Sequence, residues 1–301
     1  MNAPRMVYFA LAGHGATGLQ HLLTRGCPPV LVVTDGRVTA GDPAVAALNR
    51  RRDQLLAAYP DLLTVCHEHR VPVYLDRPDR PQTELAAAIA ALQPEVALIN
   101  TYFRILSPAV FTLPPCGTYN LHPSLLPAYR GPQPLYWAIR NGEPETGMSL
   151  QRIDAGIDTG PVFAQHRIPI GSSDTFADVY HRLTPLVAPL LDEFLLRFRG
   201  PGTPLPATTL PSAQGLPDTA ECCLNDQDLT LREAVNLIRA GNPTMPAFVA
   251  GSGYRCLVWQ AHPVPAVASE QPLVVIDDRV FLCLRDGTLA ITEFDFLHLP
   301  D

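Results

Sequence analysis

The chain has 301 residues, of which 47% are hydrophobic, so it is long enough for one large core and a second, smaller one. Its 22 basic residues are all arginine, and the absence of lysine excludes Schiff-base catalysis and a Walker-A phosphate loop. The formal net charge of -7 argues against a protein that must neutralise a nucleic-acid backbone.

Short apolar runs alternate with helical segments in the first third of the chain. The pattern predicts strands at residues 6–12, 30–34, 71–74 and 96–100, and helices at 19–24, 45–69 and 84–92. A glycine-rich turn, Gly13 to Gly18, joins the first strand to the first helix. Such alternation implies parallel pairing and right-handed crossovers. We therefore predict an α/β fold with a doubly wound, mostly parallel, Rossmann-like sheet and a binding crevice at the carboxyl ends of its strands.

The pattern changes after a strand predicted at residues 118–121. A loop at 123–132 leads to a helix at 134–141, strands at 147–152 and 161–170, and a helix at 175–199. A segment rich in Pro and Gly follows and is typical of a linker. Beyond it we expect a helix at 231–240 and strands at 254–260, 273–276, 280–284 and 289–294, with a hairpin turn at Asp286-Gly287. These features predict an N-terminal catalytic domain over residues 1–199, a linker over 200–217 and a β-rich domain over 218–301.

Cysteine usage and the start of the chain predict a cytoplasmic protein. The seven cysteines are odd in number and show no C-x-x-C spacing, as is typical of reduced intracellular thiols. The N-terminus passes directly into a short apolar strand, without the longer apolar region of a signal peptide. No apolar stretch approaches the roughly 18 residues of a membrane span. We expect no membrane partner and no metal site.

Polar side chains of three kinds gather around the strand at residues 118–121. Asn120 and His122 lie two apart, so on a strand they share one face, and Asp158 follows in a glycine-punctuated loop. An Asn N–H can stabilise an oxyanion by roughly 3 kcal/mol, and a His can accept a proton from an attacking amine. A buried Asp would fix the tautomer of that His. These residues suit acyl transfer, although turn formation and backbone hydrogen bonding would also explain them.

The run NLHPSLLPAYRG, followed by NGEPETGMSLQRIDAGIDTGP, resembles the catalytic core of the folate-dependent formyltransferases. This resemblance implies that Asn120, His122 and Asp158 catalyse formyl transfer from 10-formyltetrahydrofolate. It also implies a pterin pocket lined by Tyr102, Phe103, Arg104, Ile105 and Leu106, with Ile153, Asp154 and Ile157 on the facing loop. A strand end feeding a helix would place the first five near the crevice as well. Residues 242–248 and 286–289 resemble the barrel-like C-terminal domain of methionyl-tRNA and sugar formyltransferases.

The acceptor of the formyl group is less constrained. Residues 35–42 contain one Arg between two acids, whereas the tRNA enzymes of this family carry a basic loop there. Residues 135–137, 141–143 and 164–168 look most like the enzyme that formylates UDP-4-amino-4-deoxy-arabinose. We expect a small-molecule amine, first a nucleotide-linked amino sugar, and no nucleic-acid partner; the acceptor contacts expected are Gly13, His14, Gly15, Ser124 and Arg130.

Four alternatives for the function stay open, and one further expectation concerns assembly. The acceptor could be methionyl-tRNA, an amino acid or a carrier-bound amine. The chain could also bind folate or a nucleotide without turnover, although the presence of Asn120, His122 and Asp158 argues against this. The C-terminal domain could pair two copies in a homodimer.

Overall fold

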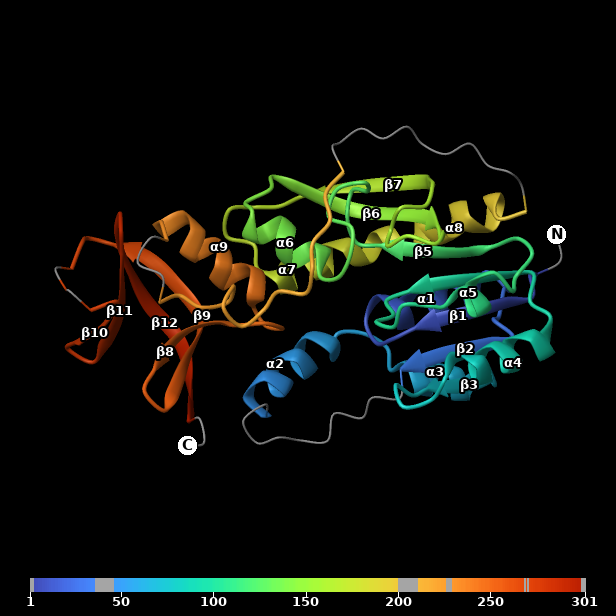
Figure 1. The fold of residues 1–301 in the computed structure, drawn as a ribbon, viewed down its shortest axis with the longest axis horizontal. Coiled ribbons are helices and arrows are strands. Elements are labelled where there is room, and N and C mark those ends of the chain that lie inside the picture. The colour runs from blue at the N-terminus through green and yellow to red at the C-terminus, as the bar shows by residue number, and fades with distance from the viewer. Residues whose placement is uncertain are drawn as a thin grey trace.

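The computed structural model describes residues 3–35, 46–199, 211–225, 229–267, 269 and 271–298. Its larger sheet has seven strands in the order β3-β2-β1-β4-β5-β6-β7 (Figure 1). Their bounds are β1 (Met6–Ala10), β2 (Leu31–Asp35), β3 (Val73–Asp76), β4 (Val96–Asn100), β5 (Thr118–His122), β6 (Glu145–Arg152) and β7 (Val162–Pro169). Strands β1 to β5 pair in parallel, whereas β6 is antiparallel to both β5 and β7. The predicted doubly wound, mostly parallel sheet is confirmed.

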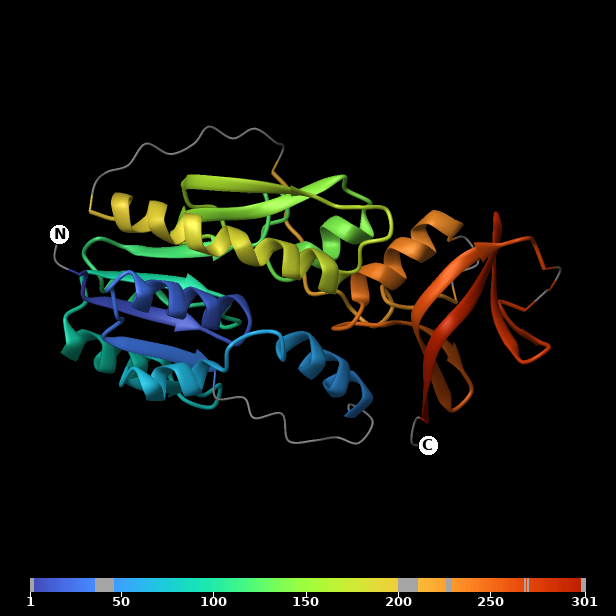
Figure 2. The same ribbon diagram turned by 180° about the vertical axis from the view of Figure 1, so that it is seen from behind.

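Both faces of this sheet are buried, which explains its unbroken apolar strands. Along β1, Met6 and Tyr8 belong to the larger apolar cluster, while Val7 and Phe9 belong to a second cluster on the other face. Helices α1 (His14–Thr24), α3 (Leu62–Glu68) and α8 (Val187–Arg197) contribute to the larger cluster, and α1 lies beside α8 (Figure 2). Helices α4 (Gln82–Leu92) and α5 (Pro108–Phe111) cover the second. The sheet is therefore the central layer of three.

Three predicted helices have different bounds in the structure. The one expected at residues 45–69 is two helices, α2 (Ala46–Leu56) and α3, because Pro60 cannot continue a helix and Asp61 caps the next one by accepting from the Thr64 N–H. The one expected at 175–199 is α7 (Phe176–Leu183), a 3-10 turn (Thr184–Leu186) containing Pro185, and α8. Helix α1 begins at His14, five residues early, because Gly13 adopts φ 77° and turns the chain directly after β1.

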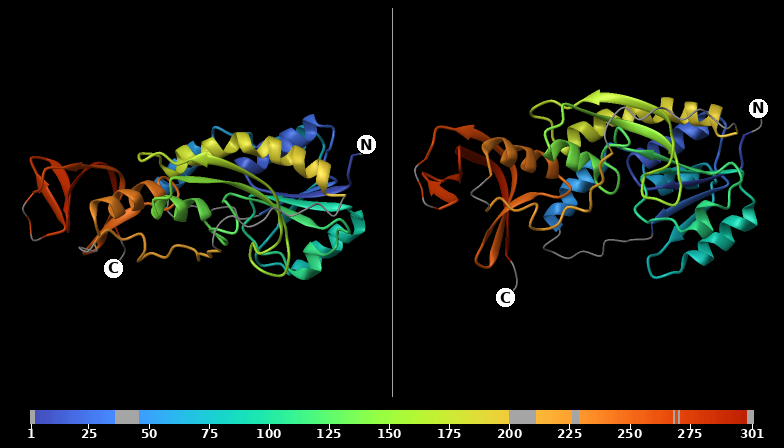
Figure 3. Two further views of the ribbon diagram at one scale, coloured as in Figure 1. Left: turned by 90° about the horizontal axis from the view of Figure 1, so that it is seen from above. Right: turned by 45° about the horizontal axis from the view of Figure 1, so that its top comes forward.

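The C-terminal part is a curled five-stranded antiparallel sheet that packs against one helix (Figure 3). Its elements are α9 (Leu231–Gly241), β8 (Ala247–Gly251), β9 (Tyr254–Val264), β10 (Leu273–Ile276), β11 (Arg279–Leu284) and β12 (Gly287–His298). The expected hairpin at Asp286-Gly287 joins β11 to β12. Strand β8 was not among the predicted elements. A β-rich second part is confirmed.

Helix α9 joins the two parts. It packs against α6 (Pro134–Arg140) and α7, and the larger apolar cluster runs on from the first sheet into the second. Residues 211–217, in the predicted linker, run along the first part and form hydrogen bonds with it (Figure 1). In the described part of the chain, no helix is long and apolar enough to cross a membrane.

Candidate active site

Asn120, His122 and Asp158 meet at the carboxyl end of β5. Strand β6 runs antiparallel to β5, so the loop after β6 begins beside the start of β5, and its residue Asp158 reaches back along β5 to Asn120 and His122. The Asn120 Nδ2 atom lies 3.4 Å from Asp158 Oδ1, and the His122 Nδ1 atom lies 3.6 Å from the same oxygen. The structure thus brings together an amide, an imidazole and a carboxylate that are up to 38 residues apart in sequence.

The imidazole of His122 has one occupied and one available nitrogen. Its Nε2 atom lies 3.0 Å from the carbonyl oxygen of Tyr129, which can only accept a hydrogen bond, so Nε2 carries the proton. In the neutral ring Nδ1 is then an acceptor, and it faces Asp158. A proton taken up at Nδ1 would meet a carboxylate. The geometry suits a general base whose protonated form is stabilised by its neighbour.

Three groups hold Asp158 in place. Gln151 Nε2 donates to Oδ1 at 2.5 Å, Asn120 Nδ2 approaches the same oxygen, and the Gly131 N–H donates to Oδ2 at 3.0 Å. Asp158 itself adopts φ 50°, a conformation that is uncommon for a residue other than glycine. Such a conformation persists where surrounding contacts enforce it, and it is frequent at functional sites.

Gln151 is a site residue that the sequence analysis missed. It pairs with Asn120 in the register of β5 and β6, and its side chain is 1% exposed. While Nε2 binds Asp158, the buried Oε1 atom has no hydrogen-bond partner among the described residues. A buried carbonyl of this kind is suited to accept a hydrogen bond from a bound molecule. No distinct signal marks Gln151 in the sequence, because the same strand also contains the polar residues Thr146, Ser149 and Arg152.

The segment expected to line the donor pocket follows β4. Leu106 is buried, and Tyr102 and Ile153 pack against the second apolar cluster. Phe103, Ile105 and Ile157 are instead 64%, 76% and 57% exposed. Large apolar side chains held in solvent beside a polar site are suited to contact a flat aromatic ligand.

A buried carboxylate that the sequence analysis did not single out fixes this segment. Asp76, at the end of β3, accepts from the Tyr102 hydroxyl and from the Arg104 guanidinium. Arg104 also donates to the carbonyl of Arg77 at 3.0 Å. Burial, together with the neighbouring Asp76, raises the pKa of the Tyr102 phenol, which therefore stays a donor. On the facing loop, Asp154 accepts from Thr159 Oγ1 at 2.6 Å and from the Gly156 N–H at 2.9 Å.

The residues expected to contact the acceptor lie in two places. Gly13, His14 and Gly15 lie where β1 leads into α1, and the His14 ring is buried, stacked on Tyr180 at a centroid distance of 3.8 Å. Burial lowers the pKa of His14 to about 4, so this ring is neutral at pH 7. His14 Nε2 also lies 2.9 Å from the Tyr180 carbonyl, so the side chain is occupied within the protein.

Ser124 and Arg130 lie in the loop after β5. The Ser124 hydroxyl is fully buried and donates to the Ala128 carbonyl at 2.8 Å, which makes it a structural part of the loop. Arg130 pairs through its backbone with residues 212–214, and its buried Nε atom has no partner in the described ranges. Of the two side chains, only that of Arg130 has an unused polar atom.

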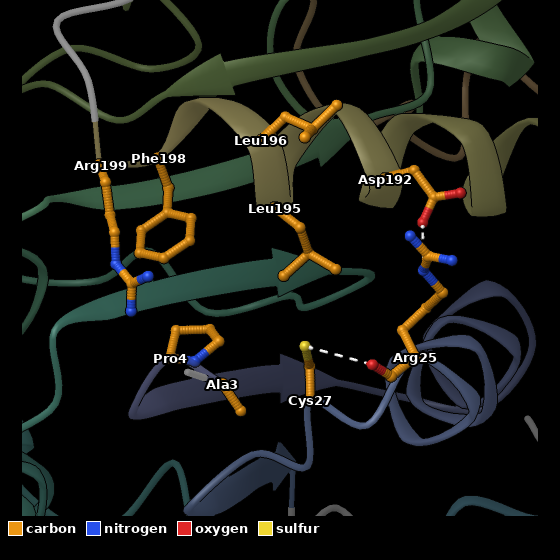
Figure 4. A pocket seen from close by; sticks show the side chains of 9 residues that line it. All are labelled: Ala3, Pro4, Arg25, Cys27, Asp192, Leu195, Leu196, Phe198 and Arg199. Atoms are coloured by element: carbon orange, nitrogen blue, oxygen red, sulfur yellow. Dashed lines mark hydrogen bonds and ion pairs between the residues drawn. The ribbon is translucent and has the colours of Figure 1, made fainter. Parts of the chain in front are cut away.

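A separate hollow of about 240 Å³ lies at the amino ends of the strands (Figure 4). It is bordered by an ion pair between Arg25 and Asp192 and by apolar side chains of α8. No group of Asn120, His122 or Asp158 borders it. Within the ranges described, no three His, Cys, Asp or Glu side chains gather as metal ligands would, and all seven cysteines are free thiols.

The doubly wound sheet and the Asn, His and Asp cluster at its carboxyl edge define a group-transfer enzyme of the α/β class. The family model of the formyl transferases matches residues 34–191, and the chain belongs to this family. The methionyl-tRNA formyltransferase of Dechloromonas aromatica is 35% identical over 211 residues, which are 70% of this chain and 68% of that protein. The corresponding protein of Aromatoleum aromaticum is 31% identical over 296 residues, covering 96% and 88%.

Solved structures with a similar fold belong to several enzymes. An N-formyltransferase from Helicobacter canadensis, in complex with folinic acid and dTDP-3-aminofucose, superposes with a TM-score of 0.68 at 17% identity, covering 97% of this chain and all of that one. HypX from Aquifex aeolicus gives a TM-score of 0.67 at 19% identity over 97% of this chain. This chain spans 46% of the HypX chain, less than half its length.

Proposed function

We propose that this formyltransferase moves a formyl group from 10-formyltetrahydrofolate to the amine of a small-molecule acceptor. The observation that carries the proposal is the state of His122. Its Nε2 is committed to the Tyr129 carbonyl, and its Nδ1 is left free beside Asp158 and close to Asn120. Amine formylation requires a proton acceptor next to an oxyanion donor and a carboxylate that stabilises the resulting charge.

The residues divide the reaction as follows. Asn120 donates from its amide to the formyl oxygen as negative charge develops there during attack by the amine. His122 takes one proton from the attacking nitrogen at Nδ1, and Asp158 stabilises the imidazolium. The bond from the formyl carbon to the acceptor nitrogen forms, and the bond to the donor nitrogen breaks. His122 then returns the proton to the donor nitrogen, so tetrahydrofolate leaves and the enzyme is regenerated.

Two observations support a folate donor. The exposed Phe103, Ile105 and Ile157 offer apolar contact to a pterin ring. Asp76 holds the segment that carries Phe103 and Ile105, because it binds their neighbours Tyr102 and Arg104. The similar N-formyltransferase from Helicobacter canadensis holds folinic acid. We assign the remaining pocket residues, Tyr102, Arg104, Leu106, Ile153 and Asp154, to the framework of this site because their side chains are bound or packed within the protein.

For the acceptor we propose a nucleotide-linked amino sugar. The net charge of -7 argues against phosphate-backbone contact along a tRNA, and the Helicobacter canadensis neighbour holds dTDP-3-aminofucose. Methionyl-tRNA is the second candidate, because the curated relatives described above are named methionyl-tRNA formyltransferases. The loop that discriminates between them by sequence, residues 36–42, lies outside the described residues.

The deciding experiment incubates the purified chain with 10-formyltetrahydrofolate and a set of amines, and detects the formyl adduct by mass spectrometry. The set comprises UDP- and dTDP-linked amino sugars, free amino acids and methionyl-tRNA, each at low and high salt. We expect an adduct on an amino sugar, absent with the His122→Ala variant. Efficient, salt-sensitive formylation of methionyl-tRNA would replace the sugar by the second candidate, and an adduct on no amine would contradict formyl transfer to the acceptors in this set.

A further inference from the structure

Residues 212–215, here called the linker segment, lie against the loop that follows β5. The Ser212 N–H donates to the Pro127 carbonyl at 3.2 Å, the Arg130 N–H donates to the Ser212 carbonyl at 3.0 Å, and the Gln214 N–H donates to the Arg130 carbonyl at 2.9 Å. Ala213 stands opposite Arg130 in a parallel bridge. The linker segment is thus joined to residues 127–131 by a parallel β-bridge and three backbone hydrogen bonds.

This loop has a conformation that needs such support. Tyr129, Gly131 and Gln133 have φ values of 56°, 94° and 54°, and the left-handed region is unfavourable for the two residues that carry a Cβ atom. The Ser212 hydroxyl accepts from the Tyr129 N–H at 2.7 Å. A Cβ atom at Gly131 would lie 2.4 Å from the Gln214 carbonyl oxygen, so the loop and the linker segment are in close contact.

One peptide unit connects the linker segment to catalysis. The peptide between Tyr129 and Arg130 directs its carbonyl to His122 Nε2 at 3.0 Å and its N–H to the Ser212 carbonyl at 3.0 Å. If this peptide turned, the His122 Nε2 proton would lose its acceptor, and the ring could take the other tautomer. The next residue, Gly131, donates its N–H to Asp158 Oδ2. Both catalytic side chains therefore depend on backbone that the linker segment holds.

We propose that the linker segment is part of the active site and that Ser212 is a positioning residue, which fixes the tautomer of His122 through the loop at residues 127–131. The catalytic consequence rests on the proposed function, whereas the effect on the tautomer does not. The linker then does more than connect two parts of the chain, because it sets which ring nitrogen of His122 is unprotonated and can accept a proton from the reacting amine.

The test is a graded series at Ser212 in the full chain. Ser212→Thr keeps the hydroxyl, Ser212→Ala removes the bond to Tyr129, and Ser212→Pro also removes the N–H that reaches Pro127. We expect Ser212→Ala to lower kcat by about fivefold, the effect of losing one ordinary hydrogen bond, with the donor KM unchanged. Ser212→Pro should lower kcat further, and Ser212→Thr should stay near the wild type. The control is Ser269→Ala, which removes a hydroxyl that accepts from the Gln271 N–H in the C-terminal part.

The ring nitrogens of His122 provide a readout independent of turnover. Nitrogen-15 NMR should show the Nε2–H tautomer in the wild type and in Ser212→Thr, and a mixture of tautomers in Ser212→Ala and Ser212→Pro. Circular dichroism identifies any variant that fails to fold, in which case the folded members of the series decide. If folded Ser212→Ala kept the wild-type kcat and a single tautomer, Ser212 would have no positioning role. If the wild type formylated no amine, the proposed function would fail while the NMR comparison would still decide the role of Ser212.

Discussion

At the scale of single residues, the site depends on which atoms are already occupied. Asp158 receives hydrogen bonds on both oxygens, and His122 gives up one nitrogen to the backbone. Among the described residues, hydrogen-bonding capacity is left on the Asn120 amide, the His122 Nδ1 atom and the buried Oε1 atom of Gln151. Each of these groups has a distinct chemical task, so each can be removed separately.

Removing the catalytic groups should affect turnover and leave donor binding intact. We expect Asn120→Ala, His122→Ala and Asp158→Ala each to lower kcat by about 10²-fold or more, because in the proposed mechanism all three act on charge and protons in the transition state. The measurement is kcat at saturating donor, with folate affinity determined by fluorescence titration. A variant with near-normal kcat would remove that residue from the mechanism.

Substitution of Asp76 should weaken binding of the donor and leave the rate of the chemical step unchanged. Asp76→Asn replaces the carboxylate that binds Tyr102 and Arg104, so the segment they hold becomes less ordered. We expect the KM for the donor to rise about tenfold, as for the loss of a hydrogen bond to a charged group, with kcat unchanged at saturation. Asp79→Asn, at an exposed position three residues later, is the matched control. A lower kcat with an unchanged KM would show that Asp76 acts on the catalytic groups instead.

At the scale of elements, the attachment of α1 to α7 depends on one neutral ring. His14 at the start of α1 stacks on Tyr180 of α7, and its Nε2 atom lies 2.9 Å from the Tyr180 carbonyl oxygen. The Tyr180 hydroxyl accepts from the His14 backbone N–H at 3.2 Å. The glycine-rich turn therefore serves packing. Gly13 illustrates this, because a Cβ atom there would meet the Tyr180 hydroxyl at 2.2 Å.

This contact predicts a loss of stability in acid. The pKa of His14 is lowered from 6.5 to about 4 by burial, so below pH 6.5 the unfolded chain binds a proton that the folded chain does not take up until about pH 4. The free energy of unfolding should therefore fall as the pH drops through this window, by roughly 3 kcal/mol in total. We expect the stability advantage of the wild type over His14→Gln to be larger at pH 7 than at pH 4.5, as measured by denaturant unfolding. As a control, the difference in stability between the wild type and His69→Gln, a substitution on the surface, should be the same at both pH values.

At the scale of the whole molecule, the two parts share one apolar cluster and one buried cation. Arg239 of α9 is 7% exposed and donates to the carbonyls of Gly171 and Asp174 at 3.2 and 3.1 Å. A second contact between the parts joins Arg51 of α2 to Glu293 of β12 at 2.5 Å. The predicted linker at residues 200–217 thus separates segments of sequence whose side chains still pack together.

Arg239→Met should loosen this attachment. The substitution keeps the apolar stem but leaves buried carbonyls without donors, so we expect the free energy of unfolding to fall by about 3 kcal/mol. Limited proteolysis should then cut near the linker sooner than in the wild type. The control is Arg232→Met, an exposed arginine on the same helix. Equal stability of the two variants would show that α9 is held by its apolar face alone.

The sequence by itself determined the strand and helix alternation and the mostly parallel sheet, and it singled out the side chains to which we assign the chemistry. It could do so because burial imposes apolar periodicity, and because Asn120 and His122 are two apart on one strand. Helix ends were less predictable, since Pro60 and Pro185 interrupt runs whose apolar pattern continues through them.

Only the tertiary structure decided what holds the site. Gln151 pairs with Asn120 through strand register, Asp76 reaches Tyr102 across 26 residues, and Ser212 contacts Tyr129 across 83. None of these pairs has a local signal, because the hydrogen bonds join segments that are adjacent only after the sheet and the linker have folded. The tautomer of His122 could not be predicted either. The Tyr129 carbonyl selects it, and the direction of that carbonyl depends on the folded backbone of the loop.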